Sequence, residues 1–249
     1  MITYTKEDLE KMLYGFACFL TGYNQLDPAF HDNQFNRERR FYGQDWPQHA
    51  ITMIGVNRLL NIQKLLFDTV QNNVPGDFIE TGVWRGGACI FAASILKLLK
   101  QTDRKVWVCD SFAGLPKPDP KYPVDNNDIH HTFSQLIVSL EEVQHNFRVF
   151  NLLDDQVKFV KGWFCDTLPT INTTFSVIRL DGDMYSSTIE ALNVLYPKLS
   201  PGGYCIIDDY CLVGARTATD DYRKQHGITS PLVEIDNRIR AVYWQKPFN

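Results

Sequence analysis

Two pairs of aspartates follow two strand-like runs in the second half of the chain. Asp181 and Asp183 come after FSVIRL, and Asp208 and Asp209 come after YCII. Four ionised carboxylates at neighbouring strand ends repel one another strongly. A divalent ion that prefers oxygen ligands, such as Mg²⁺, Ca²⁺ or Mn²⁺, relieves this repulsion. The alternative is that each aspartate caps the helix after it, which explains one carboxylate per strand but not two.

A second candidate is the turn ETGVWRGG at residues 80–87, which leaves one expected strand and enters a helix. Its small residues let the backbone approach a ligand, and the start of the helix offers unpaired N–H groups. The turn is neither the G-x-G-x-x-G dinucleotide fingerprint nor a phosphate loop. On its own, it is equally well explained as an ordinary strand-to-helix connection.

Asp110 ends the next expected strand, KVWVCD. An acidic side chain at this place can accept hydrogen bonds from both ribose hydroxyls of a nucleoside cofactor. Asp110 alone is weak evidence, but together with the glycine turn it favours a nucleoside ligand.

Strand-like runs alternate with helical patterns from residue 77 onward. The runs are DFIETG, KVWVCD, QVKFV, FSVIRLD and YCIIDD, and the chain closes with PLVEI and AVYWQ. This alternation predicts an α/β, Rossmann-like fold whose seven-stranded sheet is mostly parallel and ends in an antiparallel hairpin. Such sheets bind ligands at the carboxyl ends of their strands, where the turn and all the aspartates fall.

Two helices are expected ahead of the sheet. Thr5 with Asp8 is expected to cap the first helix, and Gly22 to end it. Pro47 is expected to open the second, because apolar residues recur at helical spacing after it. The segment Tyr23–Asp45 between them is polar and aromatic and lacks clear periodicity.

Composition excludes several broad classes of protein. The 249 residues include 25 Lys+Arg and 29 Asp+Glu, a net charge of −4, and 44% are hydrophobic. These values exclude global disorder and nucleic-acid binding by bulk charge. No apolar run is long enough for a transmembrane helix and the N-terminus is acidic, so we expect a cytoplasmic protein with no membrane partner. We expect the six cysteines to be buried free thiols.

Several features have two interpretations. Trp46 and the aromatics before it, Phe35, Phe41 and Tyr42, either line a substrate pocket or pack among themselves. The charged run at 37–40 either meets an anionic group of a substrate or forms a solvated face, and the solvated face is favoured. The pair at 130–131, His-His, is favoured as part of a solvated loop over a transition-metal site.

Long segments carry a resemblance to a known family over residues 45–246. They are DWPQHAITMIGVNRLLNIQ, GDFIETGVWRGGACIF, VWVCDSFAGLPKPD, SLEEVQHNF, LLDDQVKFVKGWFCDTLP, IRLDGDMYSST, LYPKLSPGGYCIIDDY and AVYWQ. The chain resembles the macrocin O-methyltransferases, S-adenosylmethionine- and Mg²⁺-dependent enzymes of antibiotic tailoring that methylate a sugar hydroxyl. The resemblance implies a class I methyltransferase domain at 46–249, an N-terminal helix and lid segment at 1–45, and a homodimer or larger homo-oligomer.

The resemblance also implies roles for individual residues. Asp183 would be the general base, acting on a hydroxyl of a small-molecule acceptor, most simply a sugar. The metal ligands for Mg²⁺ would be Asp181, Asp208 and Asp209. The residues facing S-adenosylmethionine would be Glu80, Thr81, Gly82, Val83, Trp84, Arg85, Asp110, Ser111, Gly162, Trp163 and Asp181.

Two other functions compete with this interpretation. Asp181-Gly182-Asp183 is also a D-x-D triplet, which resembles the metal site of nucleotide-sugar glycosyltransferases. The glycine turn, Asp110 and the second aspartate pair favour the methyltransferase. A non-enzymatic module that keeps the fold and binds a cofactor is disfavoured because neither the turn nor the carboxylates are lost.

Overall fold

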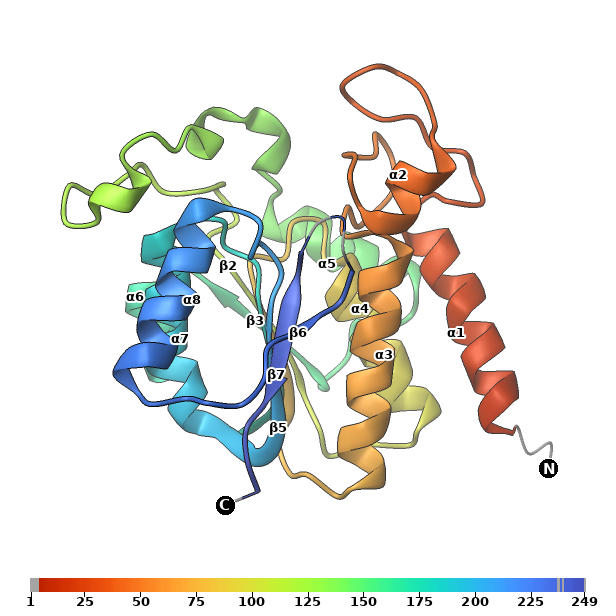
Figure 1. The fold of residues 1–249 in the computed structure, drawn as a ribbon. Helices are drawn as coiled ribbons and strands as arrows, with labels where there is room; N and C mark the ends of the chain where they lie inside the picture. The colour runs from red at the N-terminus through yellow and green to blue at the C-terminus, as the bar shows by residue number, and fades with distance from the viewer. Residues whose placement is uncertain (1–4, 237, 239, 249) are drawn as a thin grey trace.

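The structure is a computed structural model that describes residues 5–236, 238 and 240–248. Within these residues a seven-stranded sheet has the order β3-β2-β1-β4-β5-β7-β6 (Figure 1). Its strands are β1 Asp77–Thr81, β2 Val106–Asp110, β3 Val157–Lys161, β4 Phe175–Leu180, β5 Leu199–Ile207, β6 Val233–Glu234 and β7 Val242–Gln245. The first five are parallel, and β7 is antiparallel to β5 and β6, which confirms the predicted sheet.

Helices cover both faces of this sheet, and side chains alternate between two cores. Phe78 and Ile206 pack on the side of α1, α3, α4 and α5, whereas Ile79 and Ile207 pack on the side of α6, α7 and α8 (Figure 1). The α-helices in the described part of the chain are α1 Lys6–Leu20, α2 Arg37–Tyr42, α3 Gly55–Gln71, α4 Gly87–Leu98, α5 Leu140–Val149, α6 Phe164–Thr167, α7 Tyr185–Leu195 and α8 Val213–Gln225.

The strand order fixes where a ligand can bind. From β1 the chain continues to β2 and β3 on one side, then returns to β4 and β5 on the other side of β1. The carboxyl ends of β1 and β4 therefore meet at the point where the order reverses, which opens a crevice in folds of this kind.

Helix α1 begins and ends as predicted. The Thr5 side chain accepts a hydrogen bond from the backbone of Asp8, whose carboxylate accepts one in return, and Gly22 follows the helix with φ +69°. The prediction that a helix begins at Pro47 is wrong, because residues 47–54 are irregular and α3 begins only at Gly55. Gly55 has φ +76°, a conformation that interrupts a right-handed helix.

The charged run at 37–40 is not a solvated face throughout. Arg40 is fully buried, with its Nε 2.8 Å from Asp45 Oδ1, and it donates to the backbone carbonyls of Thr21 and Asp27. Arg39 pairs with Asp32 at 2.8 Å nearer the surface. The run therefore anchors residues 21–54, here named the N-terminal segment, to the end of α1.

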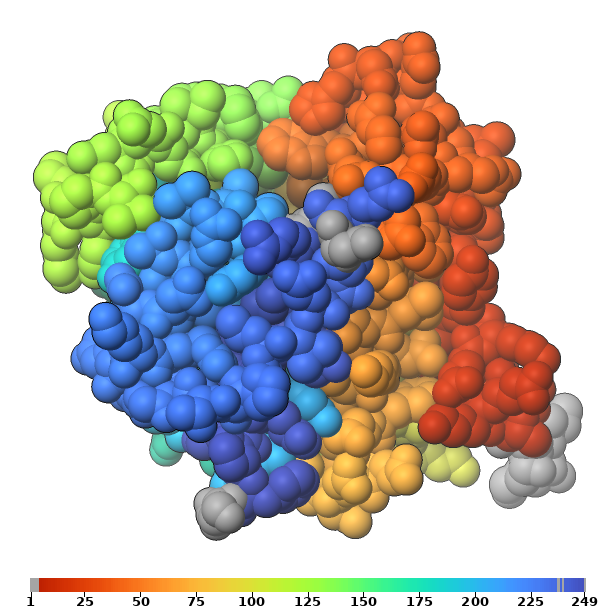
Figure 2. Space-filling view, in the orientation of Figure 1, coloured from red at the N-terminus to blue at the C-terminus, as the bar shows by residue number. Residues whose placement is uncertain are grey.

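A long connection, residues 111–138, follows β2. We name this connection the lid segment, and the term refers only to these residues from here on. It contains three short 3₁₀ turns, Pro123–Asp125, His130–Thr132 and Ser134–Leu136. Figure 2 shows the lid segment (green) and the N-terminal segment (orange) on opposite sides of the top of the molecule. No helix among the described residues is both long and apolar enough to span a bilayer.

The cysteines correct one expectation. All six are free thiols, but Cys165 and Cys211 are exposed while the other four are buried. The two exposed cysteines follow Phe164 and Tyr210, beyond the buried strands that a sequence pattern detects.

Candidate active site

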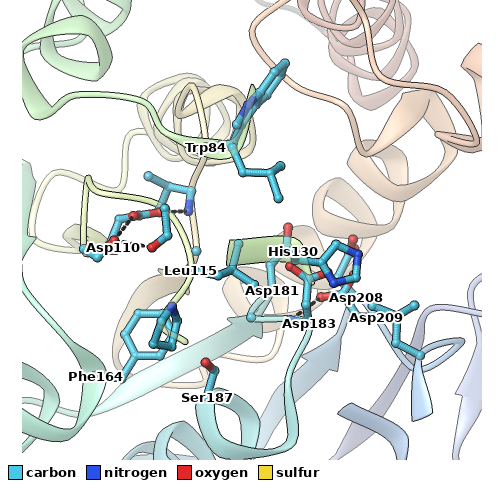
Figure 3. Close-up of a pocket in the computed structure, with 18 of the residues that line it drawn as sticks. Trp84, Asp110, Leu115, His130, Phe164, Asp181, Asp183, Ser187, Asp208 and Asp209 are labelled. Carbon is cyan, nitrogen blue, oxygen red and sulfur yellow. Dashed lines mark hydrogen bonds between the residues drawn. The ribbon is translucent and has the colours of Figure 1, made fainter. Parts of the chain in front are cut away.

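A cavity of about 470 Å³ opens at the carboxyl ends of β1, β2, β4 and β5 (Figure 3). The lid segment contributes Leu115 and His130 to its lining, and the N-terminal segment contributes Trp46 and Ile54. The predicted site residues that line it are Glu80, Gly82, Val83, Trp84, Asp110, Ser111, Trp163, Asp181, Asp183, Asp208 and Asp209. One cavity therefore brings together the turn, Asp110 and the aspartate pairs.

Asp110 is held rigidly at one end of the cavity. Its Oδ2 accepts a hydrogen bond from the Val83 N–H at 2.7 Å, and its Oδ1 accepts one from the Phe112 N–H at 2.8 Å. Burial raises the pKa of Asp110, and these backbone hydrogen bonds oppose the rise. The Ser111 hydroxyl also lies 3.4 Å from Oδ1. An acidic side chain at this strand end is placed to accept hydrogen bonds from ribose hydroxyls.

The turn after β1 approaches β4 so closely that only glycine fits at residue 82. Gly82 has φ +81°, and a Cβ there would lie 1.7 Å from the backbone oxygen of Asp181. Trp84 then donates from its indole Nε1 to the Gln135 carbonyl at 2.9 Å. The turn thus joins the end of β4 to the lid segment across the cavity.

Three predicted cofactor residues do not line the cavity. Thr81 is buried in the sheet, and Gly162 donates its N–H to the Asp110 carbonyl at 2.9 Å. Arg85 points to the N-terminal segment, where it donates to the carbonyls of Ala50 at 2.7 Å and Gln48 at 3.1 Å. These residues hold the walls of the site in place.

One buried guanidinium joins the turn to the aspartates. Arg179 of β4 contacts Glu80 through Nη1, which also lies 2.8 Å from Asp181 Oδ2, and its Nη2 lies 2.5 Å from Asp208 Oδ1. Arg58 of α3 contacts the other oxygen of Asp208. Burial nevertheless raises the pKa of Glu80 to about 7. Such a network keeps buried carboxylates in fixed positions because each of these three carboxylates contacts a guanidinium.

Three carboxylates converge beside this network. Asp181, Asp208 and Asp209 each offer an oxygen within 4.8 Å of the others, the sole such group of three His, Cys, Asp or Glu side chains among the described residues. Burial and the charges of Asp183, Asp181 and Asp208 raise the pKa of Asp209 well above its ordinary value. A hard divalent cation fits this set, because it matches the oxygen donors and offsets their repulsion.

The alternative that the aspartates cap the following helices is wrong. The N-cap residues of α7 and α8 are Met184 and Leu212, and neither side chain bonds to the start of its helix. The start of α7 is capped from the lid segment, because Asp125 accepts hydrogen bonds from the backbone N–H groups of Tyr185 and Ser186 at 2.7 and 2.9 Å. The aspartates at the strand ends therefore do not serve as helix caps, and Asp181 and Asp208 contact guanidinium groups instead.

Asp183 occupies the short connection between β4 and α7. It has φ +56°, and its N–H donates to Asp209 Oδ2 at 3.1 Å. Burial raises the pKa of Asp183 to about 7, the charge of Asp181 adds to the rise, and His130 opposes it. Its side chain belongs to the cavity but not to the converging group of three.

The sequence did not identify several lining residues. Phe164, Leu115 and Leu136 form apolar parts of the wall, and His130 lies near the acidic group (Figure 3). Phe164 directly follows the predicted site residue Trp163, and this position could have identified it. The lid residues have no periodicity that would mark them as part of a site. Of the aromatic residues with two interpretations, Trp46 lines the cavity, whereas Phe35, Phe41 and Tyr42 do not.

Comparisons with known proteins agree with this geometry. The chain matches the family described as Macrocin-O-methyltransferase (TylF) over residues 5–246. It is 48% identical over 217 residues to the mycinamicin III 3''-O-methyltransferase of Micromonospora griseorubida, with 85% of each chain covered. It is 47% identical over 237 residues to the demethyldecarbamoylnovobiocin O-methyltransferase of Streptomyces niveus, covering 91% of this chain and 90% of that protein. The solved structure of the O-methyltransferase NovP matches with a TM-score of 0.92 and 47% identity, over 96% of this chain and 100% of that one.

Proposed function

Because the chain belongs to the macrocin O-methyltransferase family and is an O-methyltransferase, we propose that it methylates a sugar hydroxyl using S-adenosylmethionine and Mg²⁺. The observation that supports this most is that one cavity holds both Asp110, bonded to the glycine turn, and the three converging carboxylates. The proposed nucleoside site and the proposed cation site would thus face the same space.

The cofactor end of the cavity would bind the nucleoside. Asp110 would accept the ribose hydroxyls, Trp163 and Phe164 would pack near the adenine, and the turn at Gly82 would face the methionine part. When bound, S-adenosylmethionine supplies a methyl group that its sulfonium already activates. The main task of these residues is therefore to hold the donor in line with the acceptor hydroxyl.

The acidic end would hold the metal and the acceptor. Asp181, Asp208 and Asp209 would bind Mg²⁺, which lowers the pKa of a hydroxyl and orients it. Asp183 would take the hydroxyl proton, since it lies in the cavity beside these ligands without belonging to their group. Arg179 would keep the ligands and the cofactor turn in a fixed relation.

The acceptor would be a small molecule that already carries the sugar. The named relatives act on mycinamicin III and demethyldecarbamoylnovobiocin. The cavity lining includes Asp119 and Glu190 as well as Lys117, and the two negative charges disfavour the diphosphate of a nucleotide-linked sugar. The apolar side chains of Leu115 and Leu136 suit the body of a natural product instead.

The competing functions have less support. A D-x-D glycosyltransferase needs both aspartates of the triplet near its metal, but Asp183 is outside the converging group that contains Asp181. A binding module without activity would not require a buried carboxylate cluster, because that cluster costs stability until a cation occupies it.

We also propose a homodimer or larger assembly, which light scattering after size exclusion would test.

Calorimetry with S-adenosylhomocysteine, with and without Mg²⁺, tests the cofactor site. We expect micromolar binding that persists in EDTA, because the metal lies on the acceptor side. Incubation with S-adenosylmethionine, Mg²⁺, and mycinamicin III or demethyldecarbamoylnovobiocin, followed by mass spectrometry, tests the acceptor. Absence of binding under both conditions would reject the methyltransferase site as described.

A further inference from the structure

The lid segment carries a histidine whose ring is held by a neighbouring aspartate. The Nδ1 of His130 lies 2.8 Å from Asp128 Oδ2, and the His130 N–H donates to Asp128 Oδ1 at 2.8 Å. A carboxylate accepts but does not donate, so it selects the form with the proton on Nδ1. In the neutral imidazole, Nε2 is then left as a hydrogen-bond acceptor.

This ring faces the acidic end of the cavity. His130 is part of the cavity lining, and Figure 3 draws its ring next to Asp181 and Asp183. An acceptor oxygen near Asp183 would therefore be near His130.

Aromatic packing fixes the ring across two segments. His130 packs edge to face on Phe133 with ring centroids 5.5 Å apart, and Phe133 packs on Trp46 at 5.8 Å. Trp46 belongs to the N-terminal segment, so the contact bridges the two sides of the cavity opening. A side chain held in this way loses little entropy when it binds a ligand.

A transition-metal site and a purely structural role both fit His130 less well. The converging ligand group in the described residues contains three aspartates and no histidine, so a transition-metal site at this pair lacks its ligands. The imidazole side chain of His130 is 25% exposed, which differs from a histidine buried solely for packing.

We propose that His130 binds the acceptor directly, with Nε2 accepting a hydrogen bond from a sugar hydroxyl, and that Asp128 is its positioning residue. This inference rests on the proposed function. It makes His130 a specificity-determining residue, because a site built to bond a hydroxyl rejects analogues that lack it.

Steady-state kinetics with whichever glycoside the wild-type enzyme methylates, mycinamicin III or demethyldecarbamoylnovobiocin, tests the proposal. For His130→Ala we expect kcat/KM to fall about 10- to 100-fold, mainly through KM for the acceptor. His130→Gln should recover part of the loss, because its amide oxygen can accept the same bond. Asp128→Asn should raise the same KM less, and S-adenosylhomocysteine affinity should not change in any variant.

His131→Ala is the matched control, because it removes the neighbouring imidazole, which does not line the cavity. Equal losses for His130→Ala and His131→Ala would overturn the proposal and indicate a structural effect. If neither glycoside is methylated, the proposed acceptors fail, and the tautomer still tests His130. Nitrogen-15 NMR of the neutral ring should place its proton on Nδ1, and a proton on Nε2 alone would reject the inference.

Discussion

The Oδ1 of Asp125 lies 2.7 Å from the backbone nitrogen of Tyr185, so the lid segment caps the first turn of α7 from sixty residues away in the chain. The other carboxylate oxygen accepts from Ser186 at 2.9 Å, and the Asp125 side chain is buried. Because α7 begins two residues after Asp183, this contact ties the lid to the connection that holds the proposed base. Lid position and active-site geometry are therefore mechanically linked.

Asp125→Ala should lower both stability and activity. Two backbone donors at the start of α7 lose their partner, which costs about 1–2 kcal/mol and lowers Tm by about 2–8 °C. The exposed Asp155→Ala should leave Tm within about 1 °C of wild type. Differential scanning fluorimetry and kcat/KM for the acceptor would measure both effects, and an unchanged Tm for Asp125→Ala would contradict the capping role.

Asp209→Asn should have opposite effects with and without metal. In EDTA, removal of a carboxylate whose pKa is raised by burial and by Asp183 should increase Tm, because the repulsion is relieved. With Mg²⁺ present, the variant should gain less Tm than wild type, since one proposed ligand is lost. Thermal unfolding over a MgCl₂ series measures both changes, and an equal Mg²⁺ effect in the two proteins would exclude Asp209 as a ligand.

Glu80 should make stability depend on pH. Burial raises its pKa from 4.5 to about 7, so between these values the folded protein binds more protons than the unfolded chain. Stability from this group therefore falls as pH rises through that window, by at most about 1.4 kcal/mol per pH unit. Glu80→Gln cannot ionise and should lack this contribution.

Urea unfolding of metal-free wild type and Glu80→Gln from pH about 5 to about 8 would measure the difference. The stability of wild type relative to the variant should decrease with pH up to about 7 and then level off. A difference that stays constant across the window would show that Glu80 ionises normally in the folded state.

The sequence predicted the fold well because the sheet depends on local patterns. Each predicted strand was found, since short apolar runs between helices have few alternatives in an α/β chain. Residues 47–54 were predicted wrongly because their backbone bonds to distant partners, such as the Gly87 N–H donating to the Ile51 carbonyl at 3.0 Å. Helical spacing of apolar residues carries no information about such contacts.

The candidate site was predicted in part for a similar reason. Residues at strand ends, such as Asp110 and Asp181, can be placed by topology alone. The lid residues cannot, because the positions of His130 and Asp125 depend on tertiary contacts across the cavity. The buried Arg40 was mistaken for a surface charge because its partner Asp45 is nearby only in the folded segment.

Gly82→Ala and Gly15→Ala should change stability in opposite directions. A Cβ at residue 82 would lie 1.7 Å from the Asp181 backbone oxygen, and the positive φ adds strain, so we expect a loss above about 3 kcal/mol or no folding. Gly15 lies within α1 with nothing within 4 Å, so alanine there should stabilise by about 0.5–1 kcal/mol. Urea unfolding and soluble yield would measure both, and a stable Gly82→Ala protein would contradict the close approach.

Asp183→Asn should separate catalysis from cofactor binding. An amide cannot take the hydroxyl proton, so kcat should fall about 10²- to 10⁴-fold, whereas S-adenosylhomocysteine affinity should stay within about twofold because Asp183 lies at the acidic end. Asp110→Ala should do the reverse at the other end of the cavity and weaken S-adenosylhomocysteine binding at least about tenfold. Calorimetry and initial rates on both variants would test this division. If Asp183→Asn keeps wild-type turnover, the proton goes to another group, and His130 is then the first to test because it lines the same end of the cavity.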